Sequence, residues 1–180
     1  MTEKKGTAAY ILRLTLTLFL ISAVVAGLLA LVNHVTADTI AEQTAEKAEA
    51  AMRQVLEAER YETLDVPADS AVTAAFRAGD EGYVVRVAPN GFGGAIDMMV
   101  GIGADGAVTG IAIVSQSETA SLGANCTRED FRQQFIGATG DLAVTKDGGT
   151  IDALTGATVT SRAVTEGVNT ALEFVQEVLQ

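Results

Sequence analysis

The sequence predicts an α+β fold in which a single N-terminal transmembrane helix and a stalk helix precede an antiparallel sheet with a C-terminal helix. Three observations support this: an uncharged apolar run near the N-terminus, short alternating segments separated by glycine-containing turns, and an amphipathic stripe near the C-terminus. We expect three parts: a cytoplasmic N-terminus with the transmembrane helix (1–35), a stalk helix and linker (36–66), and an exported domain (67–180).

The apolar run covers residues 14–32, LTLTLFLISAVVAGLLALV, and contains no charged side chain. As a helix it would be roughly 28 Å long, which matches the hydrocarbon core of a bilayer. Basic residues precede the run and acidic residues follow it, so we expect a cytoplasmic N-terminus and a C-terminal domain on the outer side of the cell membrane. A cleaved signal peptide is the alternative, because VTA at 35–37 resembles a cleavage site.

The segment that follows favours a membrane anchor over a signal peptide. Residues 37–60 are rich in Ala, Glu, Gln and Lys, which are good helix formers, so the helix is expected to continue as a stalk. Residues 61–71, which contain Pro67 together with acidic and small residues, are expected to end the stalk.

The middle of the chain predicts an antiparallel meander. The expected strands are Tyr83–Val87, Ala95–Ile102 and Val108–Val114, with turns at 89–91 and 104–106. Short connections of this kind join antiparallel neighbours.

Three further elements are expected after the meander. Residues 127–137 predict a short helix with Thr127 as its N-cap, and residues 141–154 predict a hairpin that turns at 147–149. Residues 160–179 predict an amphipathic helix that packs on the sheet. Its apolar stripe consists of Val164, Val168, Leu172, Val175 and Leu179.

Composition excludes several classes of function. Residues 14–180 contain 9 Lys and Arg against 22 Asp and Glu, so nucleic acid is not an expected partner. Cys126 and His34 are the single cysteine and the single histidine, which excludes a disulfide framework, a zinc or iron–sulfur site built from this chain, and a Ser-His-Asp triad. We expect no metal site and no catalytic residue, so redox chemistry would need a bound cofactor.

Two Gly-Ala-Thr sequences contain candidate threonines. Thr158 is expected just before the last helix, where unpaired N–H groups and the helix dipole favour an anion. Thr139 is expected after a helix and beside Asp141, where an anion is disfavoured. Residues 155–161 also fit a plain helix start with no chemistry, in which Thr160 or Ser161 is the N-cap.

The sequence Asp152-Ala-Leu-Thr-Gly-Ala-Thr158 resembles the flavinylation motif Asp-Gly-x-(Ser/Thr)-Gly-Ala-Thr of the FMN-binding domain family. The resemblance implies that FMN is covalently joined to the Thr158 hydroxyl by a phosphoester. Thr139 lacks both the aspartate six residues before it and the hydroxyl residue three before it, so it is expected to be a bystander.

A second segment, 91–123, is similar to the glycine-rich turn, two strands and Glu-Thr-Pro-Gly-Leu-Gly loop of the same family. Ala120 and Ser121 replace the usual Pro-Gly of the loop, and Ala153 replaces the usual glycine of the flavinylation motif. The residues that match the loop are Glu118, Thr119, Leu122 and Gly123.

The resemblance implies a role for each of these residues. The FMN phosphate would rest on N–H groups around Val159–Ser161, and the flavin ring would be approached by the matching loop. Asp152 would be recognised by the flavin transferase that installs FMN from FAD. The remaining expected contacts come from Thr155, Gly156, Ala157 and Thr160.

Within the family, the single span and the short chain are most similar to the G subunit of the Rnf ion-translocating ferredoxin:NAD oxidoreductase. This implies a membrane-anchored electron carrier that works with other membrane subunits and is not catalytic alone. The C subunit of the sodium-translocating NADH:quinone reductase is the alternative. Two further hypotheses are a flavin-based sensory domain and a membrane-anchored, non-catalytic interaction protein, which would need no cofactor.

Overall fold

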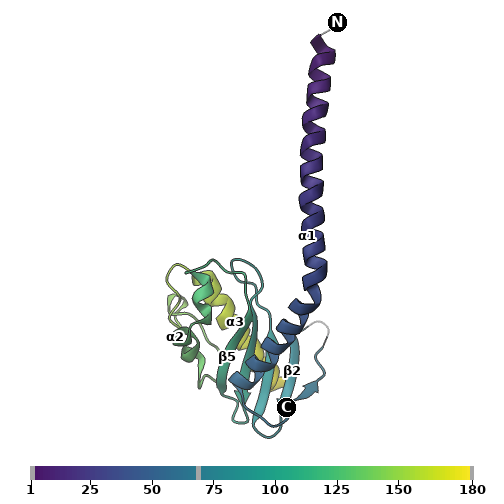
Figure 1. Ribbon diagram of the computed structural model, residues 1–180. Coiled ribbons are helices and arrows are strands. Elements are labelled where there is room, and N and C mark those ends of the chain that lie inside the picture. The colour runs from purple at the N-terminus through teal and green to yellow at the C-terminus, as the bar shows by residue number, and fades with distance from the viewer. Residues whose placement is uncertain (1–2, 68–69, 179–180) are drawn as a thin grey trace. The chain divides into compact units, whose positions relative to one another are not determined.

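The computed structural model describes residues 3–67 and 70–178. Contacts divide the chain into two compact units, residues 1–44 and 45–180. The first helix, α1 (Glu3–Val55), contains the predicted span and most of the predicted stalk, and it ends at Val55 rather than at residue 60 (Figure 1). Within the described residues, one stretch, Tyr10–Ala37, is long and apolar enough to cross a bilayer.

The second unit contains a five-stranded antiparallel sheet with strand order β1-β2-β3-β4-β5. The three predicted strands are confirmed as β3 (Gly82–Val87), β4 (Asp97–Gly103) and β5 (Val108–Ser115). Two strands, β1 (Glu62–Leu64) and β2 (Val72–Ala78), are not among the predicted elements. Val72–Ala78 contains three alanines, which have weak strand propensity, so pairing with β3 decides its conformation.

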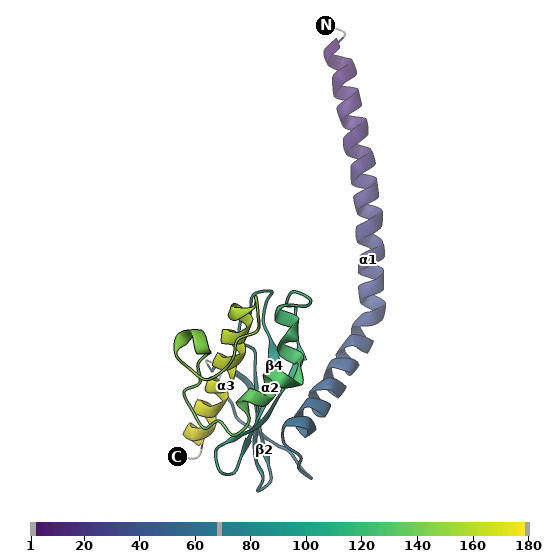
Figure 2. The ribbon, with the colours of Figure 1, turned by 90° about the vertical axis from the view of Figure 1, so that its left-hand side faces the viewer.

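The sheet is covered on both faces (Figure 2). One face packs against α3 (Thr158–Val178), and the other packs against the last turns of α1. The side chains of β4 alternate between these faces: Met98 belongs to the larger core under α3, and Met99 belongs to the smaller core under α1. The predicted α+β class is therefore confirmed.

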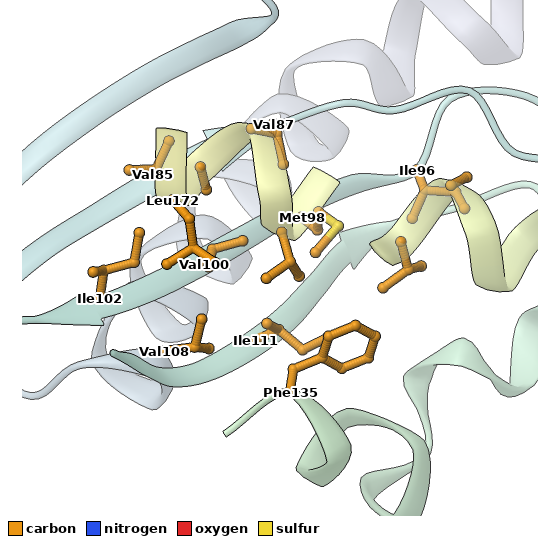
Figure 3. Packing of buried hydrophobic residues seen from close by; sticks show 14 of the residues in the cluster. Val85, Val87, Ile96, Met98, Val100, Ile102, Val108, Ile111, Phe135 and Leu172 are labelled. Carbon is orange, nitrogen blue, oxygen red and sulfur yellow. The ribbon is translucent and has the colours of Figure 1, made fainter. Parts of the chain in front are cut away.

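The core under α3 is closely packed (Figure 3). Val85, Val100 and Ile102 extend from the sheet toward Leu172 of α3, and all four are at most 2% exposed. The helical stripe is confirmed over its described part: the buried members are Val164, Val168, Leu172 and Val175. Leu179, the fifth predicted member, lies outside the described residues.

The end of α1 is held against the sheet by a close backbone approach. Thr109 of β5 donates its hydroxyl hydrogen to the Val55 carbonyl at 2.6 Å, which satisfies an acceptor at the helix C-terminus. A Cβ atom on Gly101 would meet the Val55 backbone, so the glycine allows the helix to approach the strand. Tyr61 donates its hydroxyl hydrogen to the next carbonyl, that of Leu56, at 2.6 Å.

The short helix predicted at 127–137 is confirmed in part. The structure has the shorter helix α2 (Glu129–Arg132), with the 3₁₀ turns Gly123–Thr127 before it and Gln133–Phe135 after it. Thr127 is not the N-cap, because its hydroxyl donates to the carbonyl of Ala124 within the preceding turn. Phe131 and Phe135 are both buried, and their rings meet edge to face at 5.5 Å.

The predicted hairpin at 141–154 is also wrong. Val144 and Ile151 form an isolated parallel bridge, and the 3₁₀ turn η3 (Thr145–Asp147) lies between them. Both bridge residues are buried in the core, and burying them fixes this looped path. The loop brings η3 close to the start of α3.

Candidate functional site

A cavity of about 390 Å³ lies where four segments of the second unit meet. These segments are the glycine-rich turn after β3, the loop after β5, η3 and the first turn of α3. Nine of the predicted site residues line it: Glu118, Thr119, Leu122, Gly123, Gly156, Ala157, Thr158, Val159 and Thr160. Phe92 and Lys146 line it as well and are not among the predicted site residues.

Thr158 is the first residue of α3, which begins two residues earlier than predicted. The Ser161 N–H closes the first turn by donating to the Ala157 carbonyl at 3.0 Å. The N–H groups of residues 158–160 come before this first bond, so they have no acceptor within the helix and point toward its N-terminal end. A partial positive charge accompanies them, so the hydroxyl of Thr158 stands where an anion is favoured.

The turn before α3 requires a glycine. Gly156 has φ of 76°, a left-handed conformation that side chains other than glycine seldom adopt. The Ala157 N–H donates to the Leu154 carbonyl at 3.0 Å, which tightens the chain into the helix. Gly156 thus turns the chain so that Thr158 lines the cavity.

Glu118 connects three of the four segments. Its Oε1 accepts a hydrogen bond from the Gly93 N–H at 2.8 Å, and its Oε2 accepts one from the Thr160 hydroxyl at 2.5 Å. The residue is 8% exposed, so these bonds form in a largely dry environment, where a hydrogen bond is stronger than in water. A Cβ on Gly123 would collide with this pair, which explains the glycine in the loop.

The structure separates three predicted site residues from the cavity. Ser161 is fully buried behind the first turn, where its hydroxyl accepts from the Leu154 N–H at 2.9 Å and donates to the Ala157 carbonyl at 3.0 Å. Thr155 and Asp152 instead line a second, more open hollow of about 460 Å³. The helix-cap interpretation of Thr160 and Ser161 is wrong, because both lie inside α3.

The cavity lining includes three exposed apolar side chains and one lysine. Phe92, Leu122 and Val159 are 74%, 43% and 49% exposed, which is unusual for apolar side chains that share one opening. Lys146 extends from η3 and donates from Nζ to Thr158 Oγ1 at 3.0 Å. The hairpin that the sequence predicts at 141–154 gave no reason to place Lys146 beside Thr158.

Thr139 and Cys126 are not among the residues that line the cavity. The Thr139 carbonyl accepts a hydrogen bond from Gln176 at 3.4 Å. The Cys126 thiol is buried, and burial together with the nearby Glu118 carboxylate raises its pKa to about 11. A thiol in this state is a weak nucleophile near neutral pH.

Two segments of the sequence match known protein families. Residues 91–173 match the FMN-binding domain family, and residues 1–55 match the RnfG N-terminal region. The chain is 38% identical to the G subunit of the Na⁺-translocating ferredoxin:NAD⁺ oxidoreductase complex of Acetobacterium woodii, covering 92% of each chain. It belongs to this family of G subunits.

Other G subunits are similar over most of their length. The G subunit of the ion-translocating oxidoreductase complex of Methanosarcina acetivorans is 33% identical, with 92% of this chain and 94% of that one covered. Its counterpart in Escherichia coli K12 is 34% identical, with 89% of both covered. The apolar helix and this family membership together support association with a membrane.

A solved structure shows the same fold. The C subunit of the Na⁺-translocating NADH-quinone reductase of Parabacteroides distasonis superposes with a TM-score of 0.53 at 19% identity, over 75% of this chain and 84% of that one. At this identity the likeness concerns the fold. The family of G subunits accounts for both the span and the domain of this chain, so it fits better than the alternative of a reductase C subunit.

Proposed function

We propose that this chain is a membrane-anchored electron carrier of an ion-translocating ferredoxin:NAD⁺ oxidoreductase complex and that FMN is covalently attached to Thr158. The observation that carries the proposal is the position of the Thr158 hydroxyl, at a helix N-terminus and on the wall of a cavity. The flavinylation motif and the match to the FMN-binding domain family support it.

The residues present fit FMN. The cavity volume of about 390 Å³ lies within the roughly 300–1,000 Å³ of small-molecule sites. The attachment oxygen lies on the wall of this cavity, and exposed apolar side chains of Phe92, Leu122 and Val159 share the opening. Bound FMN would supply a ring that accepts and donates electrons one or two at a time.

The chain's own residues would hold and orient this group. Thr158 provides the covalent link, and the N–H groups of the first turn of α3 face the phosphate. The Glu118 hydrogen bonds fix the loop and the glycine-rich turn against α3, so the walls keep their shape. Thr119, Leu122 and Gly123 complete the wall of the cavity.

Attachment needs a separate flavin transferase, because a threonine hydroxyl is a weak nucleophile without a base. The Thr158 oxygen bonds to the phosphorus of the FMN half of FAD, the phosphoanhydride bond breaks, and AMP and one proton are released. Asp152, exposed in the second hollow with Thr155, is available for recognition by this transferase.

The topology follows from charge and hydropathy. The basic N-terminus stays in the cytoplasm, Tyr10–Ala37 spans the bilayer, and the flavin domain faces the outer side. Neighbouring membrane subunits of the complex supply and remove the electrons. A covalent link keeps the carrier in place on the side of the membrane where free FMN would diffuse away.

Thr158→Ala should abolish covalent flavin, and Thr139→Ala, which alters the other Gly-Ala-Thr sequence, is its matched control. Both variants and the wild type are co-expressed with the flavin transferase and viewed by in-gel flavin fluorescence after denaturation. We expect fluorescence from the wild type and Thr139→Ala and none from Thr158→Ala. Fluorescence retained by denatured Thr158→Ala would contradict the assignment.

A further inference from the structure

Lys146 is the cationic side chain that lines the cavity beside the proposed attachment point. It is the only lysine after Lys47 in the sequence, and it lies in η3, a turn that local sequence patterns do not connect with Thr158. Its Nζ donates to Thr158 Oγ1 at 3.0 Å. A group bonded to this oxygen therefore begins within reach of the ammonium.

The backbone of η3 is fixed on both sides of Lys146. Val144 is 1% exposed in the core, and the Thr145 N–H donates to the Ile151 carbonyl at 2.8 Å. After the lysine, the Asp147 carboxylate accepts two hydrogen bonds from Arg162 of α3, both at 2.7 Å. This bidentate pair ties η3 to the helix one turn beyond Thr158.

The same pair leaves the charge of Lys146 available. Arg162 is the main cause of the lowered pKa of Asp147, and Lys146 contributes less. Within the described residues, the ion pairs of this unit involve arginines, and no carboxylate forms an ion pair with Lys146. An ammonium beside a hydroxyl on a cavity wall is suited to bind an anion attached to that hydroxyl.

We propose that Lys146 binds the phosphate at this site together with the N–H groups of the first turn of α3. Its ammonium donates hydrogen bonds to the phosphodiester anion attached at Thr158 Oγ1, and it stabilises the negative charge on the phosphoryl oxygens while the Thr158 oxygen displaces AMP. This inference rests on the proposed function. It adds a residue that supports both the attachment step and the attached product.

The test compares Lys146→Ala and Lys146→Arg with Arg77→Ala, which removes one positive charge from a side chain of β2 outside the cavity. Each full-length chain is purified without FMN and incubated with purified flavin transferase and FAD. Attachment is followed by intact mass. We expect Lys146→Ala to react at least about tenfold more slowly than the wild type, because it loses a hydrogen bond from a charged donor to the phosphoryl oxygens. Arg77→Ala should react like the wild type, and Lys146→Arg should recover part of the rate.

A second measurement separates phosphate binding from docking of the transferase. The Tm of each chain is measured before and after FMN attachment. Lys146→Ala is incubated longer, so that it is fully modified despite its slower reaction. We expect FMN to raise the Tm of the wild type by about 2–4 °C more than that of Lys146→Ala. Equal attachment rates would overturn the inference, as would a slow rate with an unchanged rise in Tm. Failure of the wild type to acquire FMN would instead overturn the proposed function.

Discussion

At the scale of single residues, Glu118 organises the site although it comes from a loop. Its two carboxylate oxygens satisfy one donor from the glycine-rich turn, the Gly93 N–H, and one from α3, the Thr160 hydroxyl. Each donor lies in a segment far from Glu118 in the sequence. The carboxylate therefore holds three segments together around the cavity, and its removal leaves the buried Thr160 hydroxyl without its acceptor.

We expect Glu118→Ala to lower the free energy of unfolding by about 1–3 kcal/mol, because the buried Thr160 hydroxyl and the Gly93 N–H lose their acceptor. Glu118→Gln keeps an acceptor oxygen and should be less destabilising. Urea denaturation of both variants measures the effect. Glu173→Ala, at an exposed position of α3, is the control, and an equal loss in Glu173→Ala would contradict this role.

The residues of the site were predictable where they belong to one continuous motif. The sequence around Thr158 and the loop from Glu118 to Gly123 identified nine residues of the cavity wall. Phe92 lies in the glycine-rich turn of segment 91–123, but no pattern assigned its side chain to the site. Lys146 was not predictable, because its place in the cavity depends on a turn that no short pattern specifies. For Lys146 the deciding feature is the parallel bridge between Val144 and Ile151.

At the scale of elements, the docking of the α1 C-terminus on the sheet explains the glycines of β4 and β5. Gly101 and Gly110 are paired across these strands, and a Cβ on either would contact Val55. Around this contact, Ala51, Met52 and Val55 pack on Val84, Met99, Ala112 and Val114. The small core thus buries the sheet face that α3 does not cover.

We expect Gly101→Val to destabilise the unit by about 1–3 kcal/mol, because its branched side chain would overlap the Val55 backbone and Thr109. Hydrogen exchange over residues 45–55 should then become faster, since the helix end loses its close contact with the sheet. Gly140→Val is the matched control, because a Cβ at that position meets nothing within 4 Å. Unchanged exchange in Gly101→Val would contradict the docking.

The elements were predictable where the hydrophobic period was regular. Strands β3, β4 and β5 follow from alternation, and α3 follows from a helical stripe. β1 has three residues and β2 is alanine-rich, so both depend on pairing with a neighbour rather than on their own propensity. Residues 141–154 likewise depend on distant contacts, because the burial of Val144 and Ile151 sets their path.

At the scale of the whole molecule, the proposed flavin domain includes the last turns of the helix that precedes it. The compact unit begins at residue 45, inside α1, and its sheet has an apolar layer on each side. The proposed exported domain therefore needs residues before 67 to bury its second face. A carrier built in this way has no free hinge between the last turns of α1 and its sheet.

We expect a fragment of residues 45–180 to fold and to accept FMN, whereas a fragment of residues 67–180 exposes the apolar face with Val84 and Met99 and lacks β1. The shorter fragment should have the lower Tm and a stronger tendency to aggregate. Calorimetry and size-exclusion chromatography of the two fragments measure this difference. Equal Tm values would show that the helix end contributes nothing to the domain.

The covalent attachment of FMN to one threonine is the central claim about this membrane-associated chain. The most direct measurement is the intact mass of the purified chain from a host with the flavin transferase, followed by peptide mapping. We expect a mass increase equal to FMN less one water, on the peptide that contains Thr158. An unmodified chain, or FMN mapped to another peptide such as that of Thr139, would contradict the claim and would favour a non-catalytic interaction protein or a different attachment site.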